Sequence, residues 1–332
     1  MDYKAVKKSP WNKEKYVNEH ERDVHIWCMK SNGVGRLPRL GLVGGCYTHG
    51  TLKINMLYEW IAMIIKQQEF DPGSIVLVSG PDPRNTPNKD LKKLFGSYTS
   101  MDQGVKRGDG LVEPGHYLLY IKGRILRDSK KIESYEPVIR KMPKKHKKGK
   151  DLEKDYSRSD ITRRRTLLRD QRCVITGYDF PWGPHVPNDS GFQVAHLLAL
   201  FPIFQDDYKA LVPLTSPIKV FLDKSVDLDK PYNTMLMRAD IHAYYDDYQF
   251  SVWHDRENEL FRIVRFEKYG APRLDGIKDI NLKLENGIQK IDDTIEEVDV
   301  GFLLEQTRLC VHQRFSGEGK VNIAHTSLRK KP

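Results

Sequence analysis

The chain has 332 residues, of which 39% are hydrophobic and 10% aromatic, and this composition argues against global disorder because it allows a sizeable core. Lysine and arginine outnumber aspartate and glutamate by 55 to 45, which gives a formal net charge of +10. This excess favours a polyanionic partner, either nucleic acid or an acidic membrane surface.

Residues 1–22 are charged and lack the apolar stretch of a secretory signal, so we expect a polar tail. No apolar run approaches the length of a membrane span, and no membrane association is expected. The cysteines, Cys28, Cys46, Cys173 and Cys310, are widely separated, which suits a reducing compartment and excludes a zinc knuckle built from CxxC pairs. We therefore expect an intracellular protein, in the nucleus or the cytoplasm.

The first part of the chain predicts an N-terminal α/β or α+β domain over residues 23–138. Apolar, β-branched runs predict strands at 24–29, 74–80 and 115–126. The segment 56–68 places its apolar residues at helical spacing and predicts a helix that faces the core. No function is assigned to this domain from its sequence.

Residues 139–160 are rich in lysine, low in apolar residues and interrupted by Pro and Gly, which predicts a linker. Three interpretations remain open for it: a solvated spacer, a nuclear-localisation signal and an arm that contacts phosphates.

An arginine cluster follows in "SDITRRRTLLRDQRC", which predicts a helix capped by Ser159 or Asp160. The basic residues of this cluster are Arg163, Arg164, Arg165, Arg169 and Arg172. The guanidinium fork matches phosphate oxygens, so we expect these residues to bind nucleic acid. The alternative is a solvated helix face.

Three further elements follow. The stretch "CVITGYDFPWGP" predicts a strand that enters a turn, and "GFQVAHLLALFP" predicts a strand that carries His196. The stretch "FSVWHDRENELFRIVRF" predicts a hairpin joined at Asp255–Asn258. We expect residues 271–332 to form a helical extension.

A histidine and a carboxylate lie four residues apart in "NTMLMRADIHAYYD". Asp240 can cap a short helix here, on which His242 and Asp246 would lie one above the other. Such a pair could chelate a divalent cation, although this spacing more often marks a surface hydrogen bond. Upstream, His196 ends an apolar strand and Asn233 precedes the helix, so the order is strand, His196, Asn233 and helix.

Three motifs carry a family resemblance: "CVITG" at 173–177, "AHLLALFP" at 195–202 and "NTMLMRADIHAYYD" at 233–246. The residues of these motifs and their order along the chain resemble those of the HNH endonucleases, over roughly residues 160–270. The resemblance implies a ββα-metal module at 161–270, in which two strands are followed by a metal-bearing helix. The expected fold class is therefore α+β, with this module C-terminal to the first domain.

The resemblance also implies roles. His196 would be the general base that takes a proton from the attacking water, and Asn233 would position it through hydrogen bonds to the loop backbone. His242 and Asp246 would bind one divalent cation that stabilises charge on the scissile phosphate and the leaving 3′ oxygen. The expected catalytic residues are thus His196, Asn233 and His242, and the expected product is a nicked strand, DNA rather than RNA, with a 5′ phosphate.

The sequence departs from the family pattern at two places. Many relatives carry a metal-binding Asp or His directly before the base histidine, where this chain has Ala195. With two obvious protein ligands and a partly oxygen shell, Mg²⁺ or Mn²⁺ is favoured over Zn²⁺. Gln193 is a possible neighbour, but strand alternation places it on the face opposite His196. The segment between His196 and Asn233 is also long. Ala195 is the main support for the alternative, a nucleic-acid-binding or regulatory protein with a degenerate HNH site, and the long segment agrees with it.

Overall fold

The computed structural model describes residues 22–30, 39–65, 71–87, 104–121, 160–181, 191–199, 216–223, 228–256, 258–267 and 296–315, with isolated positions between them. The chain divides into two compact units, one formed by residues 1–135 with 313–332 and the other by residues 136–312. Apart from Arg22 and Asp160, the expected tail and the expected linker lie outside the described residues.

The first unit is built on a mixed sheet with the order β2-β1-β4-β3, and β5 pairs with β4. Its strands are β1 (Val24–Lys30), β2 (Arg39–Cys46), β3 (Ile75–Gly80), β4 (Gly115–Ile121) and β5 (Arg124–Ile125). Strands β1 and β4 run parallel, and the other pairs are antiparallel. The strands expected near 24, 74 and 115 are confirmed, except that the last one folds back into the β4–β5 hairpin.

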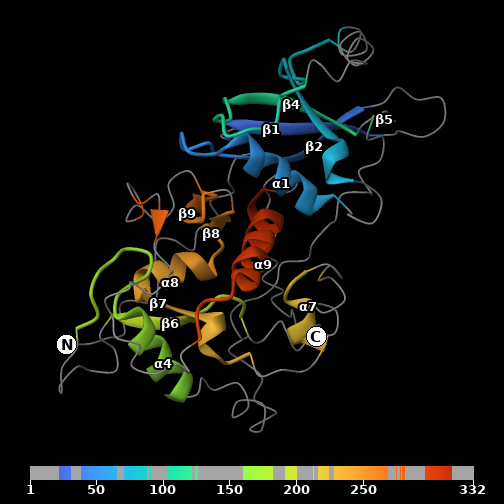
Figure 1. Cartoon of the computed structure of the whole chain (residues 1–332). Coiled ribbons are helices and arrows are strands. Elements are labelled where there is room, and N and C mark those ends of the chain that lie inside the picture. Colours follow the sequence, from blue (N-terminus) through green and yellow to red (C-terminus); the bar gives the residue numbers. More distant parts are fainter. Residues whose placement is uncertain are drawn as a thin grey trace, which may run out of the picture. The chain divides into compact units, whose positions relative to one another are not determined.

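Helix α1 (Ile54–Ile64) lies along one face of this sheet (Figure 1) and confirms the expected core helix. Its buried side chains include Leu57, Trp60 and Ile64, which follow the helical spacing seen in the sequence. The hydroxyl of Tyr58 accepts a hydrogen bond of 3.1 Å from the amide of Leu77 of β3, which connects the helix to the sheet.

Two glycines in β2 allow the chain to approach its own backbone closely. A Cβ on Gly44 would lie 2.4 Å from the carbonyl oxygen of Phe315, and one on Gly45 would lie 2.4 Å from that of Val24. The ring of Phe315 also packs edge-on against Trp60, with ring centroids 5.8 Å apart. The last described residues therefore belong to the first unit.

The second unit contains two antiparallel sheets and several helices. Its elements are α4 (Asp160–Asp170), β6 (Phe192–His196), α7 (Lys219–Asp223), the 3₁₀ turn η8 (Pro231–Asn233), β7 (Thr234–Arg238), α8 (Ala239–Asp246), β8 (Phe250–Asp255), β9 (Leu260–Arg265), β10 (Asp279–Ile280) and α9 (Val300–Cys310). Strands β6 and β7 form one sheet, and β10, β9 and β8 form the other.

Strands β6 and β7 and helix α8 form a ββα arrangement. Val194 lies opposite Leu236 and His196 opposite Thr234 in the β6–β7 pair, and α8 follows β7 without a loop. Figure 1 shows α8 on one side of this pair and α4 on the other. The mixed helix and strand content agrees with the expected α+β class.

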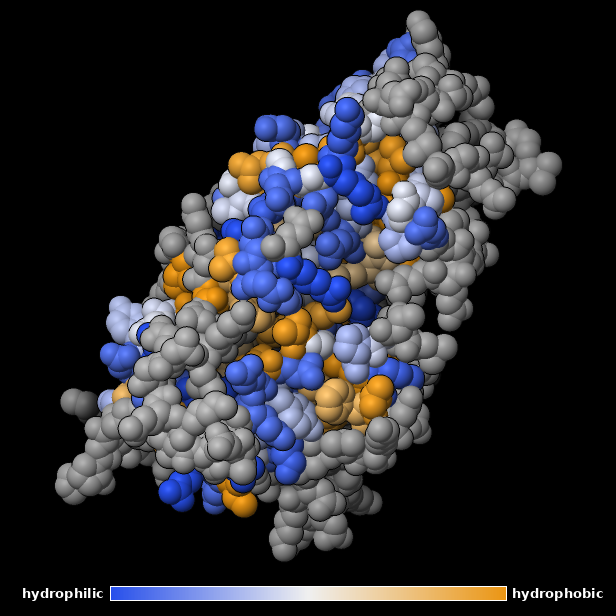
Figure 2. All heavy atoms as spheres, viewed as in Figure 1, coloured by the Kyte–Doolittle hydropathy of each residue, from blue (hydrophilic) through white to orange (hydrophobic). Residues whose placement is uncertain are grey.

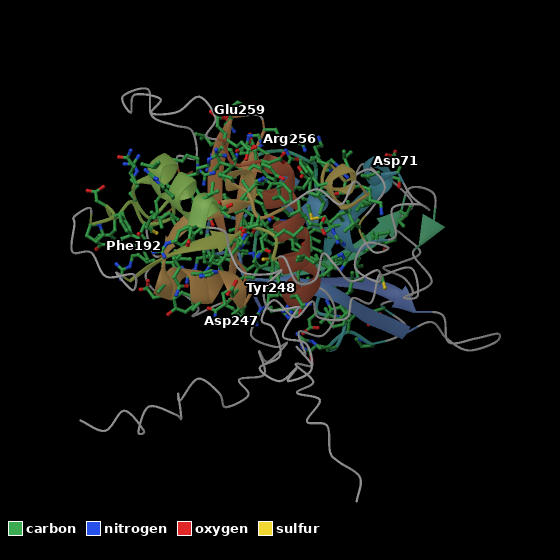
Figure 3. All side chains as sticks on the ribbon, turned by 90° about the horizontal axis from the view of Figure 1, so that it is seen from below. Asp71, Phe192, Asp247, Tyr248, Arg256 and Glu259 are labelled. Atoms are coloured by element: carbon green, nitrogen blue, oxygen red, sulfur yellow. The ribbon has the colours of Figure 1, made fainter. Side chains whose placement is uncertain are left out.

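The structure differs from the sequence expectations in two local details. Residues 174–176 form a turn instead of a strand, because the amide of Gly177 (φ 72°) returns to the carbonyl of Cys173 at 2.8 Å. Arg238 is the N-cap of α8, whereas Asp240 lies in the first turn and pairs with Arg238 at 3.1 Å. The two residues that follow α8, Asp247 and Tyr248 (φ 58°), reverse the chain into β8; Figure 3 labels both.

The β8–β9 hairpin is confirmed, and Figure 3 marks its connecting turn with Arg256 and Glu259. Helix α9 packs on β8 through a hydrogen bond of 2.7 Å between the hydroxyls of Thr307 and Ser251. On the face drawn in Figure 2, hydrophilic side chains are interspersed with smaller apolar areas. No helix within the described ranges combines the length and apolarity needed to cross a bilayer.

Candidate active site

The expected histidine–carboxylate pair is formed on α8. Nε2 of His242 lies 3.5 Å from Oδ1 of Asp246, and 9% of the His242 side chain and 21% of the Asp246 side chain are exposed. The imidazole and the carboxylate are therefore close together and partly shielded from solvent. Two ligand atoms, each about 2.1 Å from one cation, are separated by about 3.0 Å at a right angle and about 3.4 Å at a tetrahedral angle. The observed separation fits a shared cation.

Gln193 of β6 reaches the other nitrogen of this histidine. Its side-chain Oε1 lies 2.6 Å from Nδ1 of His242. An amide oxygen can only accept a hydrogen bond, so this contact requires a proton on Nδ1 and leaves the lone pair on Nε2, the nitrogen that faces Asp246. Strand alternation does place Gln193 opposite His196, and that face is the one turned toward α8.

Ala195 shares this face of β6 with Gln193, since the two residues are two positions apart on one strand. Ala195 is fully buried and offers no ligand. The described residues contain no group of three or more His, Cys, Asp or Glu side chains suited to a metal. Protein ligation at His242 and Asp246 thus leaves positions for water and phosphate oxygens, a shell that Mg²⁺ accepts.

His196 is the last residue of β6, and its ring meets a carboxylate that the sequence motifs did not single out. Nε2 of His196 lies 2.9 Å from Oδ1 of Asp229, and 8% and 13% of the two side chains are exposed. His196 and Gln193 are three residues apart, roughly 10 Å along the strand. The structure therefore places His196 and Gln193 on opposite faces of β6, with Gln193 on the face turned toward His242 of α8.

Asn233 joins the two segments that flank the site. Its side-chain oxygen accepts from the amide of Leu198 at 3.0 Å, and its side-chain nitrogen donates to the carbonyls of Leu198 and Leu228, both at 3.1 Å. Its backbone carbonyl also accepts from the amide of Leu197 at 2.9 Å. The side chain is completely buried. Asn233 thus links the backbone after His196 to the backbone before Asp229.

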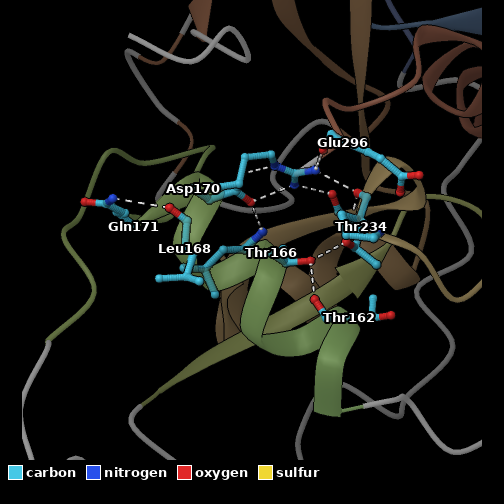
Figure 4. A network of polar contacts seen from close by, with 10 residues as sticks. Thr162, Thr166, Leu168, Asp170, Gln171, Thr234 and Glu296 are labelled. Carbon is cyan, nitrogen blue, oxygen red and sulfur yellow. Dashed lines mark hydrogen bonds and ion pairs between the residues drawn. The ribbon is translucent and has the colours of Figure 1, made fainter. Parts of the chain in front are cut away.

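Helix α4 packs against the β6–β7 sheet on the side opposite α8 and contacts β7 (Figure 4). Its buried residues Thr162, Thr166 and Arg169 follow a helical spacing and form one face. Thr166 and Thr234 of β7 share a hydrogen bond of 2.6 Å between their hydroxyls. The carboxylate of Asp170 accepts from the amide of Leu236 at 2.7 Å.

The assignment of Arg169 to nucleic-acid binding is wrong. Only 3% of its side chain is exposed, and it pairs with Asp170 at 2.6 Å. Its guanidinium also donates to the carbonyl oxygens of Pro231 at 2.7 Å, Thr234 at 2.6 Å and Glu296 at 3.2 Å. These partners occupy the guanidinium nitrogens that would otherwise donate to a phosphate, so Arg169 is a structural residue.

The other arginines differ in exposure. Arg164 is exposed on α4, whereas Arg163 and Arg165 of the same helix are half-buried. Arg172 lies beyond the end of α4 and is also half-buried. Its backbone forms an isolated antiparallel β-bridge with that of Asp179. Arg164 is therefore the most accessible basic group of the cluster.

Two residues of this site were not assigned from the sequence. Strand alternation predicts that Gln193 lies on the face opposite His196, and none of the three motifs includes Asp229, which lies in the long segment before Asn233. The available signal for Asp229 was its position four residues before Asn233, close enough to share the loop that Asn233 holds.

Comparison with known proteins locates the family resemblance. A family model described as HNH endonuclease matches residues 173–252, a segment that contains β6, β7 and α8. Neither curated proteins nor solved structures gave a match.

Proposed function

Residues 173–252 carry a domain of the HNH endonuclease family, and from this premise we propose that the protein hydrolyses phosphodiester bonds in nucleic acid, with DNA as the substrate. The observation that carries the proposal is the pair formed by His242 and Asp246 on α8, beside a strand that ends in His196. The net charge of +10 supports a polyanionic substrate.

His196 acts as the general base in this proposal. Its imidazole takes a proton from a water molecule, and the resulting hydroxide attacks phosphorus while the bond to the 3′ oxygen breaks. Asn233 is a positioning residue, because its hydrogen bonds to Leu198 and Leu228 hold the segments on both sides of His196. The products are a 5′ phosphate and a 3′ hydroxyl, whose proton comes from solvent.

His242 and Asp246 would hold one divalent cation, Mg²⁺ or Mn²⁺. When bound, the cation supplies positive charge to the scissile phosphate and to the leaving oxygen. Gln193 contributes by keeping the proton on Nδ1 of His242, so that Nε2 remains a ligand.

The exposed face of α4 would contact the nucleic-acid backbone. Arg164 is exposed, and Arg163 and Arg165 flank it in the sequence. Guanidinium groups of this kind give affinity without sequence preference, because phosphates are the same at every position.

A second candidate function is nucleic-acid binding without cleavage. Ala195 favours it, because this buried residue stands where many relatives have a metal ligand. The two candidates make the same prediction for binding and opposite predictions for metal-dependent cleavage.

The test is nicking of supercoiled plasmid by the full chain in Mg²⁺ or Mn²⁺. Reactions with EDTA are the metal-free control, and single-stranded RNA is the alternative substrate. We expect nicked circles that disappear in EDTA and with His196→Ala. His254→Ala is the matched control, since His254 stacks on Phe261 and contacts Glu259 within the β8–β9 hairpin. Plasmid that is bound but not nicked in either metal would refute the proposal and support the binding function.

A further inference from the structure

The carboxylate of Asp229 lies 2.9 Å from Nε2 of His196, and both side chains are largely buried. Burial matters here because a hydrogen bond between an imidazole and a carboxylate is stronger where water is excluded. Water would compete for the hydrogen bond of an exposed aspartate, whereas the Asp229 carboxylate is shielded from solvent.

The backbone around Asp229 is held on both sides. Thr162 of α4 donates its hydroxyl to the carbonyl of Asp229 at 2.5 Å. Asn233 donates to the carbonyl of the preceding Leu228 at 3.1 Å, and the amide of Asn233 returns to the carbonyl of Lys230 at 3.0 Å. The carboxylate is therefore supported by a helix and a turn, as a side chain that must orient another group requires.

We propose that Asp229 is the positioning residue of the base, forming a carboxylate–imidazole dyad with His196. The inference rests on the proposed function, because it concerns the same reaction. The carboxylate accepts the hydrogen on Nε2, so the proton removed from water goes to Nδ1. The imidazole becomes an imidazolium, which the neighbouring carboxylate stabilises while the hydroxide attacks phosphorus.

The charged and titratable groups on the adjoining elements are compatible with this role. Arg169 of α4 donates to the carbonyls of Pro231 and Thr234, the latter being the residue opposite His196. Tyr245 of α8 donates its hydroxyl to the carbonyl of Leu197 at 3.4 Å. Asp229 supplies the negative charge that compensates the imidazolium next to these groups.

The kinetic test compares Asp229→Asn and Asp229→Glu with the wild type. We expect Asp229→Asn to reduce kcat about ten- to a hundredfold while KM for plasmid and the affinity for Mn²⁺ stay unchanged. The acidic limb of its pH–rate profile should move to lower pH, because the protonated ring loses its stabilising carboxylate. Asp229→Glu should recover part of the rate. Asp179→Asn, an exposed aspartate, is the control and should behave as wild type.

An unchanged or increased rate for Asp229→Asn, with an unchanged pH profile, would overturn the dyad. Thermal unfolding of each variant identifies any loss that comes from a damaged fold, and Thr162→Val then provides a second variant that moves Asp229 without removing the carboxylate. Partial loss of rate with Thr162→Val is expected, and wild-type rate in both variants overturns the inference.

A readout independent of activity separates the dyad from the proposed function. Two-bond ¹⁵N–¹H correlations of the His196 ring should show the proton on Nε2 in the wild type near neutral pH, with loss of this preference in Asp229→Asn. A proton on Nδ1 alone would overturn the dyad even if the protein cleaves DNA. A chain that fails to cleave yet shows the Nε2 proton would refute the nuclease and leave the dyad intact.

Discussion

Replacing Arg169 by alanine tests how the second unit is held together. Its guanidinium forms an ion pair with Asp170 and donates to the carbonyls of Pro231, Thr234 and Glu296. The substitution removes the guanidinium donor of these carbonyls, and Asp170 then keeps its hydrogen bond from the amide of Leu236.

Breaking a buried ion pair by removing one partner costs about 3–5 kcal/mol. Since hydrogen bonds to a charged group contribute about 1.5–3 kcal/mol each and are not additive, we expect a loss of about 4 kcal/mol in the free energy of unfolding of the second unit. A typical domain is stable by about 5–15 kcal/mol, so this loss would leave it marginal. Arg169→Lys keeps the charge but not the fork, and we expect it to recover less than half of the loss.

The assay is urea unfolding followed by hydrogen exchange of peptides that cover residues 228–246. Arg164→Ala is the matched control, because Arg164 is exposed on the same helix and its replacement should change the free energy by less than about 0.5 kcal/mol. A loss below about 1 kcal/mol for Arg169→Ala, or equal losses for the two variants, would refute the structural role of Arg169.

Three further predictions concern other residues. Gln193→Leu should weaken Mn²⁺ binding about tenfold or more by calorimetry, because Nδ1 of His242 loses the acceptor that fixes its proton; unchanged affinity would contradict this. Replacing Arg163, Arg164 and Arg165 together by glutamine should reduce the slope of log K for DNA against log salt by up to about 3, whereas an unchanged slope would make α4 a solvated face. Burial raises the pKa of Cys46 to about 12 from the ordinary value of 9.0. The unfolded chain therefore releases this proton first, and stability should fall as pH rises from about 9 to about 12; Cys46→Ala should lack this part of the alkaline loss in a denaturation series.

The elements that were predictable from the sequence are those whose pattern is local. Helix α1 and strand β3 follow from the spacing of their apolar residues, and the β8–β9 hairpin follows from two such runs around a polar turn. The sequence at residues 173–177 predicts a strand, but the segment folds as a turn because its amides form hydrogen bonds within the segment and to β7.

The site was predictable in part for the same reason. His242 and Asp246 are neighbours on one helix, so their spacing is sufficient to bring them together. Asp229 meets His196 only after the intervening segment has folded back, and no local pattern encodes that approach. The burial of Arg169 had a visible signal, since it shares a helix face with Thr162 and Thr166, whereas Arg164 lies on another face. The number of arginines in α4 therefore does not indicate how many are accessible, because one face of the helix is buried.

The central claim is that His242 and Asp246 share one divalent cation. Crystals grown with Mn²⁺ allow its position to be read from an anomalous difference map. The account predicts one strong peak within about 2.2 Å of both Nε2 of His242 and the carboxylate of Asp246. A map in which Mn²⁺ occupies other sites while this pair remains joined only by its direct contact would contradict it.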